Sequence, residues 1–200
     1  SMISETELFF QEILDKDLSL LNFIESGFTY LNGRLASHYG IEGVVGQKLR
    51  RVKLPPDSMR GGLLTQASIL KVTANGTYTS PVLRGVWVLE NILGTPTSPP
   101  PDNVGSVEPD TRGSTTLREE LAKHREAKSC SACHRKIDPP GFALECFDPI
   151  GGFRERYRTM AESGERPGIS RAPCTWEWVR FRIGLPVDAT GRMSDGEQFT

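Results

Sequence analysis

Apolar residues recur with helical spacing along the first part of the chain. Residues 4–15 have one apolar face, and Ser4 and Glu7 stand at the spacing of a capping box. After a short apolar run, residues 29–39 fit a further helix. Gly40 would end it, because glycine accepts the left-handed backbone conformation beyond a helix end. The pattern therefore predicts two helices upstream of Gly40.

The strongest helix signals lie further along the chain. A loose alternation over residues 48–54 predicts a short strand, and residues 63–72 predict a helix. The clearest helix follows Ser80, a natural N-cap, with Pro81 at the first helical position, where no amide hydrogen is needed. Apolar residues then recur at helical spacing until Gly94, which is placed to end the helix.

Proline and capping signals divide the second half of the chain. Residues 95–113 hold five prolines, which predict an extended connector without helix or central strand. Thr116 and Glu119 form the spacing of a capping box for a helix that runs to about Lys128. Residues 137–153 predict a loop-rich stretch with a short helix near 142–147.

The tail contributes the β-structure of the prediction. Residues 176–183 alternate like a strand, and Thr190 with Gly191 suggests a hairpin turn. The predicted fold class is therefore mainly α, with a long proline-rich connector and a minor β hairpin at the C-terminus.

Composition narrows the function classes. The chain has 200 residues with 24 Lys and Arg against 25 Asp and Glu, which argues against a general nucleic-acid or anionic-membrane surface. No apolar run approaches the length of a membrane span, and no signal peptide opens the sequence. The four cysteines are few for a disulfide scaffold.

The motif that carries chemistry is Cys130-x-x-Cys133-His134, the pattern of a haem c attachment site. Two thiols at this spacing can form thioethers with both vinyl groups of one porphyrin edge, and the adjacent imidazole can ligate the iron. Zinc is an alternative, with Cys146 or His124 completing the ligand set. A redox dithiol is disfavoured, because the βαβ setting of thioredoxin-like folds is absent.

The sixth iron position stays open at the level of sequence. An open or water-filled position is one alternative, and the candidate protein ligands are His38, His124, Met59, Met160 and Met193. His124 lies on the apolar face of the helix before the motif, where a histidine is more often packed than ligating. A backbone carbonyl of Pro139 or Pro140 can accept the Nδ1 hydrogen of His134 and orient the ring.

Two further sets of residues have alternative roles. Arg135, Lys136, Arg154 and Arg156 can neutralise haem propionates, although a solvated basic surface is the more ordinary role for each. Cys146 and Cys174 can pair in an oxidising compartment, which an even number of remaining cysteines permits but does not require.

Several segments together resemble the planctomycete-type cytochrome c-like family described as domain of unknown function 1588. They are residues 60–67, 75–77, 79–94, 117–125 and 130–154, the last including Cys130, Cys133 and His134. Residues 28–40 are similar to the end of the companion family numbered 1592, and residues 184–191 to the start of the family numbered 1585. The family pattern usually has asparagine at the position of Cys146.

The resemblance implies a piece of a larger exported, multidomain protein of the periplasm or cell envelope. Its expected parts are the end of a helical domain over 1–53, a haem c-binding domain over 54–157, and a linker with the start of another domain over 158–200. The expected function is single-haem electron transfer or redox sensing with an unidentified redox partner. The alternatives are a structural module that docks neighbouring domains and holds zinc or nothing, or part of a haem enzyme.

Overall fold

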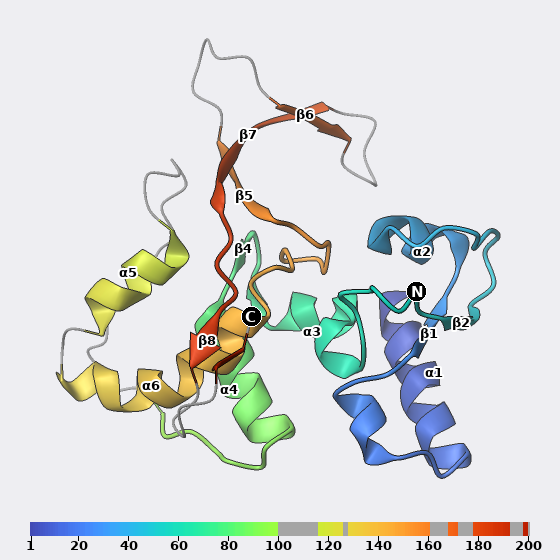
Figure 1. Ribbon diagram of the computed structural model, residues 1–200, viewed down its shortest axis with the longest axis horizontal. Helices are drawn as coiled ribbons and strands as arrows, with labels where there is room; N and C mark the ends of the chain where they lie inside the picture. The colour runs from blue at the N-terminus through green and yellow to red at the C-terminus, as the bar shows by residue number, and fades with distance from the viewer. Residues whose placement is uncertain (100–115, 126–127, 161–167, 172–177, 193–197, 200) are drawn as a thin grey trace. The chain divides into compact units, whose positions relative to one another are not determined.

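The computed structural model describes residues 1–99, 116–125, 128–160, 168–171, 178–192 and 198–199 (Figure 1). The chain divides into two compact units. Unit 1 comprises residues 1–79 and 147–153, and unit 2 comprises residues 80–146 and 154–200. Most of the predicted connector over 95–113 lies outside the described residues.

Unit 1 combines helices with two small pairs of antiparallel strands. In chain order its elements are helix α1 (Met2–Asp15), 3-10 helix η1 (Leu20–Phe23), strand β1 (Phe28–Leu31), helix α2 (Gly33–Tyr39), strand β2 (Arg50–Lys53), 3-10 helix η2 (Leu63–Thr65), helix α3 (Ala67–Val72), and strands β3 (Ala74–Asn75) and β4 (Tyr78–Thr79). β1 pairs with β2, which confirms the strand predicted there, and β3 pairs with β4.

The core of unit 1 lies between α1 and β1. Phe9, Ile13, Phe28 and Leu63 form one buried cluster, in which the ring centroids of Phe9 and Phe28 are 5.2 Å apart. Burial of these side chains is the main term that holds the short elements together, because none of them is long enough to be stable alone.

Two predictions about where helices of unit 1 begin are wrong. α1 begins at Met2 with Ser1 as its N-cap, so Ser4 and Glu7 lie inside the helix and form no capping box. The predicted helix over 29–39 is a strand followed by a helix, because residues 28–31 pair with the distant strand β2, which their aromatic and β-branched side chains also suit. Asn32 then caps α2, and Gly40 ends it at φ 72°, as expected.

The described part of unit 2 contains three helices together with a small sheet. Its elements are helices α4 (Pro81–Asn91), α5 (Leu117–His124) and α6 (Lys128–Ala143), and strands β5 (Arg156–Met160), β6 (Gly168–Arg171), β7 (Trp178–Pro186), β8 (Gly191–Arg192) and β9 (Gln198–Phe199). The sheet is antiparallel in the order β5-β7-β6, and β8 pairs with β9 near the C-terminus, where a minor hairpin was predicted. The turn predicted at Thr190 and Gly191 is wrong, because Gly191 lies within strand β8.

The capping signals of α4 and α5 are confirmed. The Ser80 side chain accepts a hydrogen bond from the Leu83 amide at the start of α4, and Gly94 has φ 60° beyond its end. Thr116 and Glu119 form both hydrogen bonds of a capping box at the start of α5.

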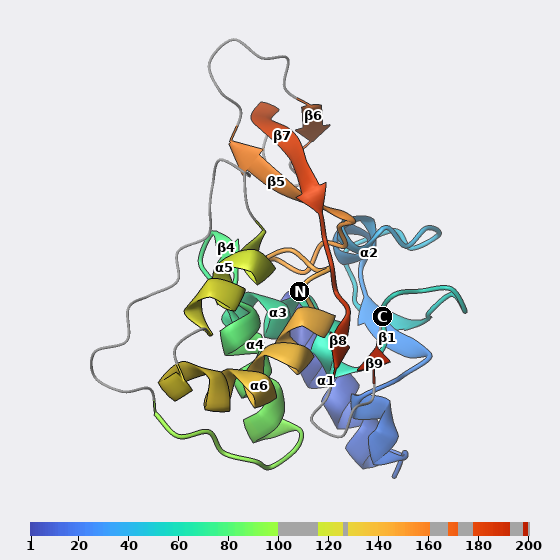
Figure 2. The same ribbon diagram turned by 60° about the vertical axis from the view of Figure 1, so that its left-hand side comes forward.

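Helix α6 packs closely against α4, and Figure 2 shows the two helices side by side. A Cβ atom at Gly85 would lie 1.8 Å from the carbonyl oxygen of Ile137, and one at Gly141 would lie 1.9 Å from that of Pro81. These two glycines therefore let the helix backbones approach one another. α6 also continues through Pro139 and Pro140, where a loop was predicted, because it packs closely against α4.

The prediction of a mainly α fold holds in outline, since helices outweigh strands in the described chain. The three-stranded sheet of β5, β6 and β7 was not predicted beyond the strand over 176–183, which corresponds to β7. Among the described residues, no helix combines the length and apolar character needed to cross a membrane.

Candidate functional site

Helix α6 carries the whole cysteine motif near its N-terminal end. Cys130, Cys133 and His134 occupy positions i, i+3 and i+4, which share one face of an α-helix. Cys133 is exposed, Cys130 is partly buried, and the His134 side chain is 13% exposed. The structure therefore brings the three predicted site residues together on one accessible helical face.

The imidazole of His134 is held by a carboxylate one helical turn further along. His134 Nδ1 lies 2.8 Å from Asp138 Oδ1, and Asp138 is completely buried. The predicted partner was a backbone carbonyl of Pro139 or Pro140. Carbonyls of an α-helix point toward its C-terminus, away from a ring at position 134, whereas side chains lean back toward the N-terminus. The side chain at i+4 is therefore the group that reaches the ring.

A cation balances part of the Asp138 charge. Arg125 Nε lies 3.6 Å from Asp138 Oδ2, at the start of the connection between α5 and α6. Burial raises the pKa of Asp138, while the hydrogen bond to His134 and the nearby charges of His134, Arg125 and His124 oppose that rise. The geometry is that of an oriented imidazole with a buried, partly compensated carboxylate behind it.

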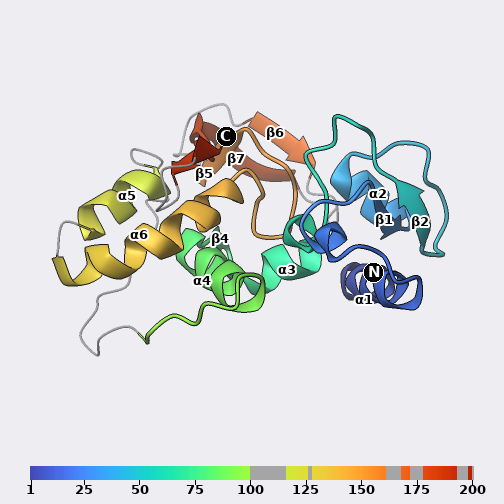
Figure 3. The same ribbon diagram turned by 60° about the horizontal axis from the view of Figure 1, so that its bottom comes forward.

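Helix α5 runs antiparallel to α6 and places a second histidine at the site (Figure 3). The Arg118 guanidinium, in the first turn of α5, lies 3.9 Å from the centroid of the Phe142 ring in the last turn of α6. At the other end of the pair, the rings of His124 and His134 meet edge to face with centroids 5.1 Å apart. The predicted apolar-face histidine is thus packed directly against the motif histidine.

Of the remaining candidates for the sixth iron position, two belong to unit 1 and two have side chains outside the described part of the structure. His38 belongs to unit 1, where its Nε2 lies 2.8 Å from the carbonyl oxygen of Ile150, and Met59 of the same unit is 60% exposed. The side chain of Met160 is not among the described parts of the structure, and Met193 lies outside the described residues.

The basic candidates for propionate binding divide into two groups. Arg135 and Lys136 are exposed on α6, next to the motif. Arg154 instead donates to Glu145 Oε1 at 2.6 Å, and Arg156 donates to the carbonyl of Gly184 at 3.2 Å. The guanidinium of Arg154 therefore serves an internal ion pair.

The buried carboxylate of Glu145 is the centre of a charge cluster at the end of α6. It lies between Arg154 and the fully buried Arg84 of α4, whose Nη1 is 3.8 Å from Glu145 Oε2 and 2.6 Å from the carbonyl oxygen of Leu144. A buried charge is stable only when paired and hydrogen-bonded, so this cluster fixes the C-terminal end of α6 against α4. No sequence signal identified it.

The other two cysteines do not enlarge the site. Cys146 is a partly buried thiol whose sulfur lies 3.8 Å from the carbonyl oxygen of Ala143, and burial raises its pKa. Cys174 lies outside the described residues, and so does the pairing with Cys146 that the sequence left open. Within the described part of the chain, no three His, Cys, Asp or Glu side chains converge as a metal site, so the zinc alternative gains no preformed ligand set.

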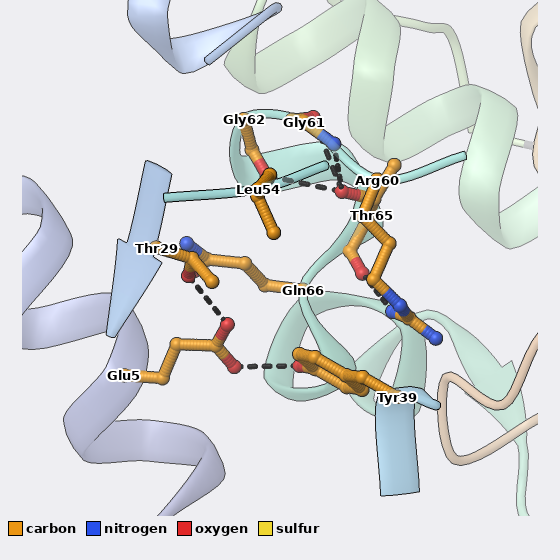
Figure 4. Close-up of a pocket in the computed structure, with 9 residues that line it drawn as sticks. All are labelled: Glu5, Thr29, Tyr39, Leu54, Arg60, Gly61, Gly62, Thr65 and Gln66. Atoms are coloured by element: carbon orange, nitrogen blue, oxygen red, sulfur yellow. Dashed lines mark hydrogen bonds between the residues drawn. The ribbon is translucent and has the colours of Figure 1, made fainter. Parts of the chain in front are cut away.

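Unit 1 contains a polar cluster of its own around the buried carboxylate of Glu5 (Figure 4). Thr29 Oγ1 donates to one carboxylate oxygen at 2.7 Å, and the Tyr39 hydroxyl donates to the other at 2.6 Å. The Arg60 guanidinium lies 3.7 Å from the centroid of the Tyr39 ring. The adjoining cavity of about 10 Å³ is too small for a ligand larger than water. Sequence reasoning missed this cluster, because its members are scattered singly along the chain.

Two known protein families match separate segments of the chain. Residues 60–157 match PSCyt3, a protein family of unknown function (DUF1588), and residues 1–41 match PSD4, a protein family of unknown function (DUF1592). Neither the curated proteins nor the solved structures include a match to this chain. The PSCyt3 segment contains Cys130, Cys133, His134 and Asp138, together with residues of both units. Two family models thus match separate parts of the chain, and the one that matches residues 60–157 includes the cysteine motif.

Proposed function

We propose that this chain binds haem c covalently through Cys130 and Cys133, with His134 as an axial ligand of the iron, and that it exchanges single electrons. The observation that carries the proposal is the arrangement of the two thiols and the imidazole on one accessible face of α6. The name of the matched family, PSCyt3, also supports a cytochrome-like role.

The residues present fit such a group in three respects. The thiols are exposed or only partly buried, so a porphyrin edge has access to them. The hydrogen bond from His134 to Asp138 occupies Nδ1 and so leaves Nε2 as the nitrogen for a metal. The exposed Arg135 and Lys136 supply positive charge beside the motif for carboxylate groups.

Each residue has a defined chemical role in this proposal. Each thiol adds across one vinyl double bond, so that sulfur bonds one carbon and hydrogen the other, and no electron is lost or gained. His134 then supplies the axial nitrogen, and Asp138 holds the ring in its orientation. Bound haem would supply a one-electron redox couple. The exported parent protein that the resemblance implies would be matured in the periplasm or cell envelope.

The test is covalent attachment. The chain is co-expressed with a cytochrome c maturation system, and haem is detected after denaturing electrophoresis and by the pyridine haemochrome spectrum. We expect a haem-stained band for the unsubstituted chain and none for the Cys130→Ser, Cys133→Ser double variant. Cys146→Ser is the matched control, because it removes a thiol of the same unit outside the motif.

Two results would contradict the proposal. One is haem stain that persists in the double variant at the level of the unsubstituted chain. The other is a folded, unsubstituted chain that takes no haem under maturation and instead holds zinc near one per chain by metal analysis, which would favour the structural module.

A further inference from the structure

We infer that Asp138 is a positioning residue that sets a low reduction potential for a haem held by His134. This inference rests on the proposed function, and it assigns a role to a carboxylate that the sequence motif does not include. Asp138 reaches the ring of His134 and no part of the thiol pair in the described contacts.

Asp138 and His134 form a pair with a defined geometry. Asp138 Oδ1 lies 2.8 Å from His134 Nδ1, on the same helix and one turn along, and Asp138 is completely buried. Because α6 packs against α4 through Ile137 and Gly141 on either side of Asp138, the carboxylate is fixed by the helix pairing and not by a loop. The direction of the imidazole is therefore set before any cofactor binds.

The contact with Asp138 changes how strongly the His134 ring donates electrons to a metal. A carboxylate that accepts the Nδ1 hydrogen raises the basicity of the ring and makes Nε2 a stronger donor than a neutral carbonyl partner would. Stronger donation stabilises the more positive, oxidised iron over the reduced iron, and second-shell hydrogen bonds are among the levers that set haem potentials. The contact thus favours the oxidised state.

The positive charge of Arg125 opposes the effect of Asp138. Arg125 Nε stands 3.6 Å from Asp138 Oδ2 and has a side chain that is 32% exposed. Because this contact is longer than that to His134 and partly open to solvent, it reduces the effect of the carboxylate without cancelling it. The net expectation remains a potential lower than that of the same site with a neutral residue at position 138.

The experiment measures two properties of the matured chain and of Asp138→Asn, which keeps the size and an acceptor oxygen but removes the charge. Spectroelectrochemical titration should give a higher midpoint potential for the variant, with the ratio of oxidised to reduced haem changed about tenfold at fixed potential, or 59 mV for one electron. Asp188→Asn is the matched control, because Asp188 pairs with Arg118 in the same unit and does not contact His134.

A second readout does not depend on haem or on a variant. In the ¹⁵N-labelled, haem-free full chain, long-range ¹⁵N–¹H correlation at a pH where the imidazole is neutral should show His134 as the Nδ1–H tautomer. If this haem-free chain shows the Nε2–H tautomer, the positioning role is overturned. That conclusion holds whatever the result of the haem attachment test and even if Asp138→Asn fails to fold.

The outcomes separate this inference from the proposed function. Attached haem with equal potentials for the unsubstituted chain and Asp138→Asn overturns the inference and leaves the proposed function standing. A chain that takes no haem removes the proposed function, and with it the effect on potential. If Asp188→Asn raises the midpoint potential as much as Asp138→Asn does, the effect comes from net charge. That result also overturns the inference.

Discussion

The buried carboxylate of Glu5 makes the stability of unit 1 depend on pH in a direction opposite to that of most acidic residues. Burial raises the pKa of Glu5 from 4.5 to about 7, against the opposing hydrogen bonds from Thr29 and Tyr39 and the charge of Arg60. The native state therefore holds a proton between these two values that the unfolded chain releases. The stabilisation is fully present below pH 4.5 and is lost as the pH rises through about 7.

The size of the effect follows from the difference between the two pKa values. A pKa raised from 4.5 to about 7 corresponds to about 3 kcal/mol of unfolding free energy, since each tenfold change in proton affinity is worth about 1.36 kcal/mol. Glu5→Gln should abolish this pH dependence, because an amide does not titrate in this range.

The assay is hydrogen exchange of α1 and β1 peptides in urea, repeated between about pH 5 and about pH 8 and corrected for the intrinsic exchange rate. It reports on unit 1 directly. Glu7→Gln is the matched control, since Glu7 is exposed on the same helix. Equal slopes of stability against pH for the unsubstituted chain and Glu5→Gln would refute the assignment of the proton to Glu5.

The remaining predictions concern unit 2 and use thermal or chemical unfolding followed by circular dichroism. Gly85→Ala should separate α4 from α6 at a cost of about 1–3 kcal/mol, because its Cβ would lie 1.8 Å from the Ile137 carbonyl oxygen; an unchanged melting temperature would contradict that packing. Arg84→Met should cost about 3–5 kcal/mol by leaving Glu145 less compensated, and adding Glu145→Leu should recover part of the loss. Thr116→Ala should cost about 1 kcal/mol and speed amide exchange only in α5.

Helices with capping or terminating residues at their ends could be predicted from the sequence. α4 has Ser80, Pro81 and Gly94 at its boundaries, and α5 has a capping box, so short-range chemistry alone defines where these helices begin or end. The strand β1 could not be predicted in the same way. Its residues 28–31 form a strand because residues 50–53 pair with them, and that pairing is a long-range contact.

The residues of the candidate site could be named from the sequence, but the carboxylate that contacts His134 could not. Cys130, Cys133 and His134 are named by their spacing, whatever the fold. Asp138 was missed because Pro139 and Pro140 signal the end of a helix, and in a loop the i+4 spacing from His134 has no structural meaning. The packing of α6 against α4 overrides the proline signal, and it is this continuation that turns Asp138 toward the ring.

Exposure changes along α6 in a way that suits a surface cofactor with an internal support. Cys133, Arg135 and Lys136 are exposed near the N-terminal end, whereas residues from Ile137 to Phe142 are buried or nearly so against the rest of unit 2. The thiols therefore remain accessible to a large planar group, while the carboxylate that orients His134 is kept out of water. A buried carboxylate acts more strongly on its hydrogen-bond partner than an exposed one, because less of its field is screened. Moving Asp138 to the exposed half of the helix would keep its charge and lose most of its influence on the imidazole.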